Sequence, residues 1–224
     1  PVATFLLVKD VKLDTREETK IEENNKEIKQ WKRIEVLKDY RFYIICMTML
    51  AMPWIATGSF VYQSFISSSK EWGPYVIAQS FMAYSILSVI TLFISGFLID
   101  KFSSRKLLIY MNIPLLFGTI VLYYFNAPLS SFVFFGLVGV TNGLANVLGS
   151  STWAEIYGVK YIGSIKALTT ALMVFSTAFG TALFGFLIDI GFSIEDIAVV
   201  SGTYIFGSII LLYLVKNKLN PNYL

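Results

Sequence analysis

The pentapeptide GFLID occurs at Gly96–Asp100 and again at Gly185–Asp189, 89 residues further along (185 − 96). The first copy continues into KFSSRK, which holds three basic residues. The second continues into IGFSIED, which holds two acids and no base. Any explanation of the repeat must therefore account for the opposite charge that follows its two copies.

The composition indicates an integral membrane protein. The chain has 224 residues, of which 55% are hydrophobic and 15% charged, whereas soluble domains average about 45–50% apolar and about 25% charged. Residues 9–41 hold ten of the eighteen Lys and Arg residues and nine of the fifteen acids. The rest of the chain is consequently almost free of charge, as a bilayer interior requires.

Six apolar stretches follow the charged segment, and each is long enough to cross the hydrocarbon, which takes about 20 residues. They cover residues 42–66, 74–98, 107–125, 130–152, 164–188 and 196–215. We therefore expect an all-α membrane protein with a six-helix transmembrane domain over 42–215.

The remaining segments flank this domain. Residues 9–41 are expected to form a charged cytoplasmic linker, and residues 216–224 a short cytoplasmic tail. The apolar run at 1–8, PVATFLLV, is too short to span a bilayer. We expect it to be the end of a preceding transmembrane helix, which would make the chain a fragment of a longer protein.

The basic residues predict the orientation, because cytoplasmic loops carry an excess of Lys and Arg. The linker, the loop at 101–106, the segment at 153–166 and the tail are all basic, whereas the three loops on the other side contain only Lys70. We expect a protein of the plasma (inner) membrane with its linker and carboxyl terminus in the cytoplasm.

A shift of 89 residues superimposes the first three apolar stretches on the last three. Three is an odd number, so the second unit crosses the membrane upside down relative to the first. This pattern predicts two inverted three-helix repeats, an arrangement common in secondary transporters. It also explains why one GFLID copy is followed by bases and the other by acids.

Several function classes are excluded or disfavoured by residues that are missing. The sequence contains no histidine and one cysteine, Cys46, so a His-ligated metal or haem and a His-activated nucleophile are impossible. No charged residue lies in the middle of an apolar stretch, where a proton relay would need one. The bases alternate with acids and form no nucleic-acid patch. We expect no enzyme, metal or cofactor.

Other residues predict local features of the helices. Asn112 and Pro114 predict a kink in the third stretch. Gly139 and Gly143 have the spacing that permits close helix contact. The hydroxyls of Thr170, Thr177 and Thr181 are expected to face packed neighbours.

The stretch GFLIDKFSSRK at 96–106 resembles the loop motif of the major facilitator superfamily, Gly-x-x-x-Asp-(Arg/Lys)-x-Gly-x-(Arg/Lys)-(Arg/Lys). The matching residues are Gly96, Asp100, Lys101, Arg105 and Lys106, and Ser103 stands at the second glycine of the motif. The segments at 154–163 and 179–189 give softer support. The resemblance implies the carboxyl-terminal six-helix half of such a transporter, with a missing amino-terminal half as its partner.

Asp100 is the candidate for a cytoplasmic gate. A carboxylate at the carboxyl end of a helix is unfavourable for that helix's dipole, so it needs a partner such as Arg105, Lys106 or a neighbouring helix end. The resemblance implies that Asp100 meets a helix of the missing half when the cytoplasmic side closes. Alternatively, the motif only signals topology. Glu155 is expected to pair with Lys160 or Arg105, or to be solvated.

Two stretches supply candidates for a solute cavity. Asn142 and Asn146 share one helical face of the fourth stretch, and Asn is costly in lipid without a partner or a wet cavity. The first stretch offers Trp54, Gly58, Tyr62 and Gln63. The resemblance implies that both stretches line the central cavity. The alternatives are helix–helix hydrogen bonds for the asparagines and packing for Trp54 and Tyr62.

The expected function is therefore secondary active transport of a small solute by alternating access, with or without a proton or other coupling ion. One alternative is a self-contained six-helix carrier that acts as a dimer. Another is a non-transporting scaffold or accessory subunit, in which Asn142 and Asn146 would face packed neighbours rather than a cavity.

Overall fold

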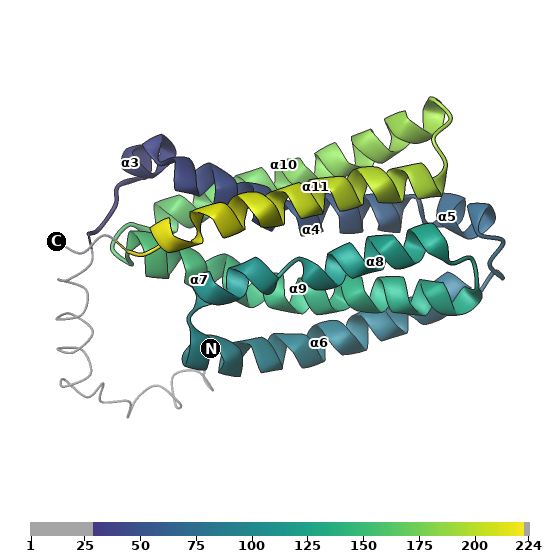
Figure 1. The fold of residues 1–224 in the computed structure, drawn as a ribbon, viewed down its shortest axis with the longest axis horizontal. Coiled ribbons are helices and arrows are strands. Elements are labelled where there is room, and N and C mark those ends of the chain that lie inside the picture. The colour runs from purple at the N-terminus through teal and green to yellow at the C-terminus, as the bar shows by residue number, and fades with distance from the viewer. Residues whose placement is uncertain (1–28, 222–224) are drawn as a thin grey trace, which may run out of the picture.

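The structure is a computed structural model that describes residues 29–221 (Figure 1). The expected helix end at 1–8 and most of the expected linker at 9–41 lie outside the described residues. The described part of the linker contains the short helix α3 (Arg33–Lys38) and the beginning of α4.

Six helical spans are long and apolar enough to cross a membrane, so the predicted all-α membrane fold is confirmed. Five are single helices and one is interrupted: α4 (Tyr40–Val61), α6 (Val76–Phe102), the interrupted α7–η1–α8 span (Ser104–Leu107, Leu108–Tyr110, Ile113–Tyr124), α9 (Pro128–Tyr157), α10 (Ile162–Asp189) and α11 (Ile194–Val215). Two short elements, α5 (Gln63–Ser69) and η2 (Lys216–Lys218), follow α4 and α11. Residues 29–221 contain no strand.

The spans begin and end up to five residues away from the predicted stretches, and two of them differ in continuity as well. The first was expected to reach residue 66, but α4 ends at Val61 and α5 begins a new helix after Tyr62. The kink expected in the third is a complete break, since α8 begins at Ile113 with a proline in its first turn. Proline suits that position because it has no N–H to donate. At the break, Asn112 Nδ2 donates to the backbone carbonyl oxygen of Thr48 in the neighbouring helix α4 (2.6 Å).

The helix contacts confirm the inverted repeat. Helix α6 packs along α9, and α4 packs along α10. Helix α8 contacts α9 and α11, and α11 also contacts α4. Exchanging the units, α4 for α9, α6 for α10 and α8 for α11, maps these contacts onto one another. The two GFLID copies end α6 and α10 at opposite ends of the bundle (Figure 1).

Glycines permit the two closest helix contacts. A Cβ on Gly143 of α9 would lie 2.6 Å from the carbonyl oxygen of Ser88 in α6, and Gly139 approaches the Tyr84 backbone even more closely. Gly180 of α10 lies against the Trp54 backbone of α4 in the same way. Any larger residue would push the helices apart. The predicted role of Gly139 and Gly143 is confirmed.

The two ends of the bundle differ in charge. We call the end that carries α3, α7 and η2 the basic end, and the end that carries α5 the opposite end (Figure 1). Twelve of the thirteen described Lys and Arg residues belong to the basic end, and only Lys70 belongs to the opposite end. A one-sided distribution of this kind is typical of membrane proteins with a fixed orientation.

Candidate functional site

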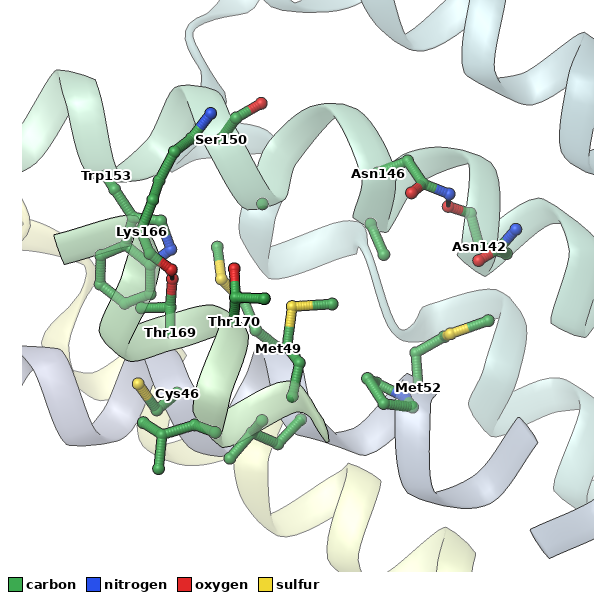
Figure 2. Close-up of a pocket in the computed structure, with 16 residues that line it drawn as sticks. Cys46, Met49, Met52, Asn142, Asn146, Ser150, Trp153, Lys166, Thr169 and Thr170 are labelled. Atoms are coloured by element: carbon green, nitrogen blue, oxygen red, sulfur yellow. Dashed lines mark hydrogen bonds between the residues drawn. The ribbon is translucent and has the colours of Figure 1, made fainter. Parts of the chain in front are cut away.

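A cavity of about 320 Å³ lies between α4, α9 and α10 (Figure 2). Helix α4 comes from the first three-helix unit, and α9 and α10 come from the second, so the cavity lies where the two units meet. Its polar lining residues are Asn142, Asn146, Ser150, Lys166, Thr169 and Thr170. Methionines and Trp153 form much of the apolar lining.

The cavity extends from the middle of the bundle toward the basic end. Asn142 is near the midpoint of the 30-residue helix α9, 14 residues after Pro128 and 15 before Tyr157. Trp153 and Lys166 lie close to the basic end of α9 and α10. A polar cavity that reaches from the middle of the helices toward one end is suited to a solute site.

The two candidate asparagines line this cavity. Asn142 Nδ2 donates to Ser88 Oγ of α6 (2.8 Å), and Asn146 Nδ2 donates to the Asn142 carbonyl oxygen (2.9 Å). Within residues 29–221, no group donates to either side-chain carbonyl oxygen. The helix–helix bond of Asn142 thus coexists with exposure to the cavity.

The four candidates from the first span lie outside the lining of this cavity. Trp54 is buried and its ring contacts Phe184 edge-on, while Tyr62 stacks on the same ring. A Cβ on Gly58 would overlap the Phe184 ring. Gln63 lies in a separate shallow depression at the opposite end. Their spacing of four places Trp54 and Gly58 on one face of α4, with Tyr62 just beyond its end, and all three pack against α10.

Three polar residues of the cavity were not predicted to line it. Lys166 was used only for orientation, Thr170 was assigned to packing, and Thr169 was not considered. The three share one face at the start of α10, since positions separated by three and four residues are neighbours on a helix. A lysine four residues into an apolar span, with two threonines on the same helix face, is the pattern that could have indicated a polar site.

Glu155 closes the motif loop at the basic end. Its carboxylate accepts hydrogen bonds from the backbone N–H of Ser104 (2.9 Å) and from the hydroxyls of Ser103 and Ser104, and it pairs with Arg105 Nε (2.9 Å). Arg105 rather than Lys160 is therefore its partner. Ser103 has φ = 72°, in the left-handed region that favours glycine. This conformation explains why the motif has a glycine at that position.

The other motif residues make fewer contacts. Asp100 is exposed, and nothing in the described part of the chain forms an ion pair or hydrogen bond with its carboxylate. Lys101 and Lys106 are exposed, and a Cβ on Gly96 would meet no atom within 4 Å. Arg105 does not pair with Asp100, because its guanidinium contacts Glu155 and Asn220.

A second acid at the basic end, Asp39, holds together three segments that are distant in sequence. Asp39 Oδ2 pairs with Arg41 Nε (2.8 Å) and accepts a hydrogen bond from the Tyr157 hydroxyl (3.1 Å). Arg41 Nη1 donates to the Lys218 carbonyl oxygen (2.9 Å). Both members of the ion pair are buried. This cluster could not be predicted from local patterns, because Asp39 and Arg41 belong to a long run of mixed charge.

Lys70 performs a similar role at the opposite end. Its ammonium group is buried and lies 2.6 Å from Glu195 Oε1 and 2.7 Å from Asn126 Oδ1. The Trp72 indole also donates to the Asn126 carbonyl oxygen (2.8 Å). One lysine therefore connects the segments that follow α5, follow α8 and begin α11.

Six apolar spans in two inverted units, with a polar cavity between the units, define a membrane-transporter domain. A model of the Major Facilitator Superfamily matches residues 9–222, and the chain belongs to this superfamily. Its members are integral membrane proteins that transport small solutes across the lipid bilayer. The resemblance seen in the motif at 96–106 is confirmed. No curated protein matches the chain in sequence.

Proposed function

We propose that the chain is the carboxyl-terminal half of a secondary active transporter and that its cavity forms one wall of the solute site. The observation that carries this proposal is the position of the cavity, between two inverted units and lined from the middle of α9 to the residues near the basic end. An amino-terminal helical half would supply the other wall. The basic end would face the cytoplasm, as the distribution of Lys and Arg favours.

Alternating access requires contacts that exist in only one state. Asp100 is suited to such a contact because its carboxylate is exposed at the basic end and has no partner among residues 29–221. We assign to it the role of a cytoplasmic gate, which binds the other half when that side closes. Gly96, Lys101 and Lys106 complete the gate motif, and Glu155 with Arg105 fixes its loop.

Most of the remaining candidates would hold the walls of the cavity in place rather than contact the solute. Trp54, Gly58 and Tyr62 pack α4 against Phe184 of α10. Because α4 and α10 form two walls of the cavity, this contact would fix their separation while the halves rock. Gln63, the first residue of α5, would contact solute at the opposite end of the bundle rather than in this cavity.

A non-transporting scaffold would place Asn142 and Asn146 against packed neighbours. Both instead line the cavity, and each keeps a side-chain carbonyl oxygen without a donor among the described residues. This placement favours transport over a scaffold role.

Uptake by the full-length protein in liposomes tests the proposal. Organic acids, amino acids and sugars would be screened with and without a pH gradient, which also reveals coupling to protons. We expect uptake of at least one class, and Asn146→Ala should reduce it by about tenfold, the effect of losing about 1.4 kcal/mol. Asn217→Ala, an exposed position at the basic end, is the matched control. Correctly inserted protein that transports nothing would overturn the proposal.

A further inference from the structure

We infer that the transported solute is a small organic anion, a carboxylate, which binds Lys166 at the mouth of the cavity. This inference rests on the proposed transport function and gives it a substrate class. It follows from the charge of the lining, from the depth of Lys166 and from the hydrogen-bonding groups beside it.

The cavity carries one sign of charge. Lys166 is the charged residue of its lining, and the lining contains no Asp or Glu. Across residues 29–221, no acid lies within ion-pair distance of the Lys166 ammonium group. At the basic end, Asp39 is engaged with Arg41 and Glu155 with Arg105, and Asp100 forms no ion pair with Lys166. A positive charge therefore lies at the rim of the cavity without a counter-charge among the described residues.

Lys166 is an exposed residue near the end of α10, and its side chain can reach both the cavity mouth and water. Helix α10 has 28 residues, so its length is about 42 Å, and it exceeds the hydrocarbon thickness by about 12 Å. Lys166 comes four residues after Ile162, about 6 Å along the helix, so with α10 centred in the bilayer it would lie near the hydrocarbon boundary. An ionised side chain at this depth is stable only toward water or a partner. A wet cavity that admits an anion provides both.

The helix adds to the positive potential at this point. Lys166 lies near the amino end of α10, where the helix dipole carries a partial positive charge. A lysine is electrostatically unfavourable there unless a negative group lies close by. An anion at the cavity mouth would be attracted by both the ammonium group and the helix end.

Neutral polar groups complete a carboxylate site. The Thr170 hydroxyl lines the cavity, and its hydrogen bonds are not used within the described residues. Lys166 and Ser150 lie at one end of the cavity in Figure 2, and Asn142 and Asn146 at the other. Methionines cover part of the surface between them. This order suits a carboxylate at the mouth, with an apolar or hydroxyl-bearing body reaching toward the asparagines.

Matched solutes separate charge from shape. The full-length protein in liposomes would be offered carboxylates beside their neutral amides, such as lactate with lactamide and propionate with propionamide. We expect uptake of carboxylates to exceed that of the amides at least tenfold. Lys166→Gln should lower carboxylate uptake at least tenfold, and Lys166→Arg should retain most of it. Lys160→Gln, an exposed lysine of the same end, should have no effect.

Thermal unfolding in detergent gives a readout that does not depend on transport. A carboxylate that binds the folded protein should raise the Tm of the wild type but not that of Lys166→Gln. The inference is overturned if only neutral or cationic solutes are carried, or if Lys166→Gln takes up and binds carboxylates like the wild type. Either result would leave the transporter intact, whereas failure to carry any solute would refute the proposed function itself.

Discussion

At each end of the bundle, charged residues connect segments that are distant in sequence, but the sign of the connecting charge differs between the two ends. Twelve bases and four acids of the described chain belong to the basic end, whereas the opposite end has four acids and one base, Lys70. At the basic end, the acids Asp39 and Glu155 connect separate segments. At the opposite end, Lys70 does so. At each end, residues of the minority charge take part in contacts between distant segments, and at the basic end Arg41 and Arg105 also bind residues 218 and 220.

The physical reason is the cost of burying a charge. A charged group can leave water only where opposite charges and hydrogen-bonding groups surround it. A residue of the minority sign has many such neighbours, whereas most residues of the majority sign remain solvated and favour one orientation. Asp100 departs from this pattern, because it is in the minority at its end and yet has no described partner.

The largest effect on stability is expected at Asp39. Asp39→Asn would leave Arg41 buried without a counter-charge, and the loss of one partner of a buried ion pair costs about 3 kcal/mol. The free energy of unfolding of the full-length protein in detergent should fall by that amount. Asp100→Asn makes the same charge change at an exposed site of the same end and serves as the control. Equal losses of stability in the two variants would show that the buried ion pair of Asp39 does not stabilise the fold.

A smaller effect is expected at the opposite end. Lys70→Met removes the bridge between Asn126 and Glu195, but Glu195 is partly exposed and can regain water. The expected loss is about 2 kcal/mol, typical of a hydrogen bond to a charged group. Thermal unfolding would measure it against Lys106→Met, an exposed base of the basic end. If Lys70→Met left the thermal stability unchanged, the packing of these loops would not depend on the contacts of Lys70.

The smallest effects distinguish the two acids of the motif region. Glu155→Gln should lower the unfolding free energy by about 1 kcal/mol, because its carboxylate is partly solvated. Asp100→Asn should change it by less than about 0.5 kcal/mol, as is usual at exposed sites. If Asp100 is the gate, its variant should alter the transport rate more than the solute affinity. If Asp100→Asn transports solute at the wild-type rate, Asp100 does not act as the gate.

The fold was predictable from local patterns. The apolar stretches, the 89-residue repeat and the one-sided bases led to six spans in two inverted units. The breaks after Val61 and before Ile113 were placed less accurately, because helix ends depend on turn conformations and on tertiary contacts such as that of Asn112 with Thr48.

The site was predictable only in part. Asn142 and Asn146 were found because a polar side chain in an apolar span needs a special environment. Trp54 and Tyr62 gave an equally regular pattern, but which neighbour covers a helix face cannot be read from its spacing. Lys166 was assigned to orientation, since a lysine near a helix end usually serves that purpose.

The sequence by itself determined the membrane class, the six spans, the duplicated unit and the superfamily motif, because hydrophobicity, length and charge asymmetry act along the chain. The tertiary structure decided which faces meet. It placed Arg105 with Glu155 rather than with Asp100, turned Trp54 toward α10, and brought Lys166 into the cavity with Asn142 and Asn146. These relations depend on how the inverted units pack, and packing joins residues that no local pattern connects.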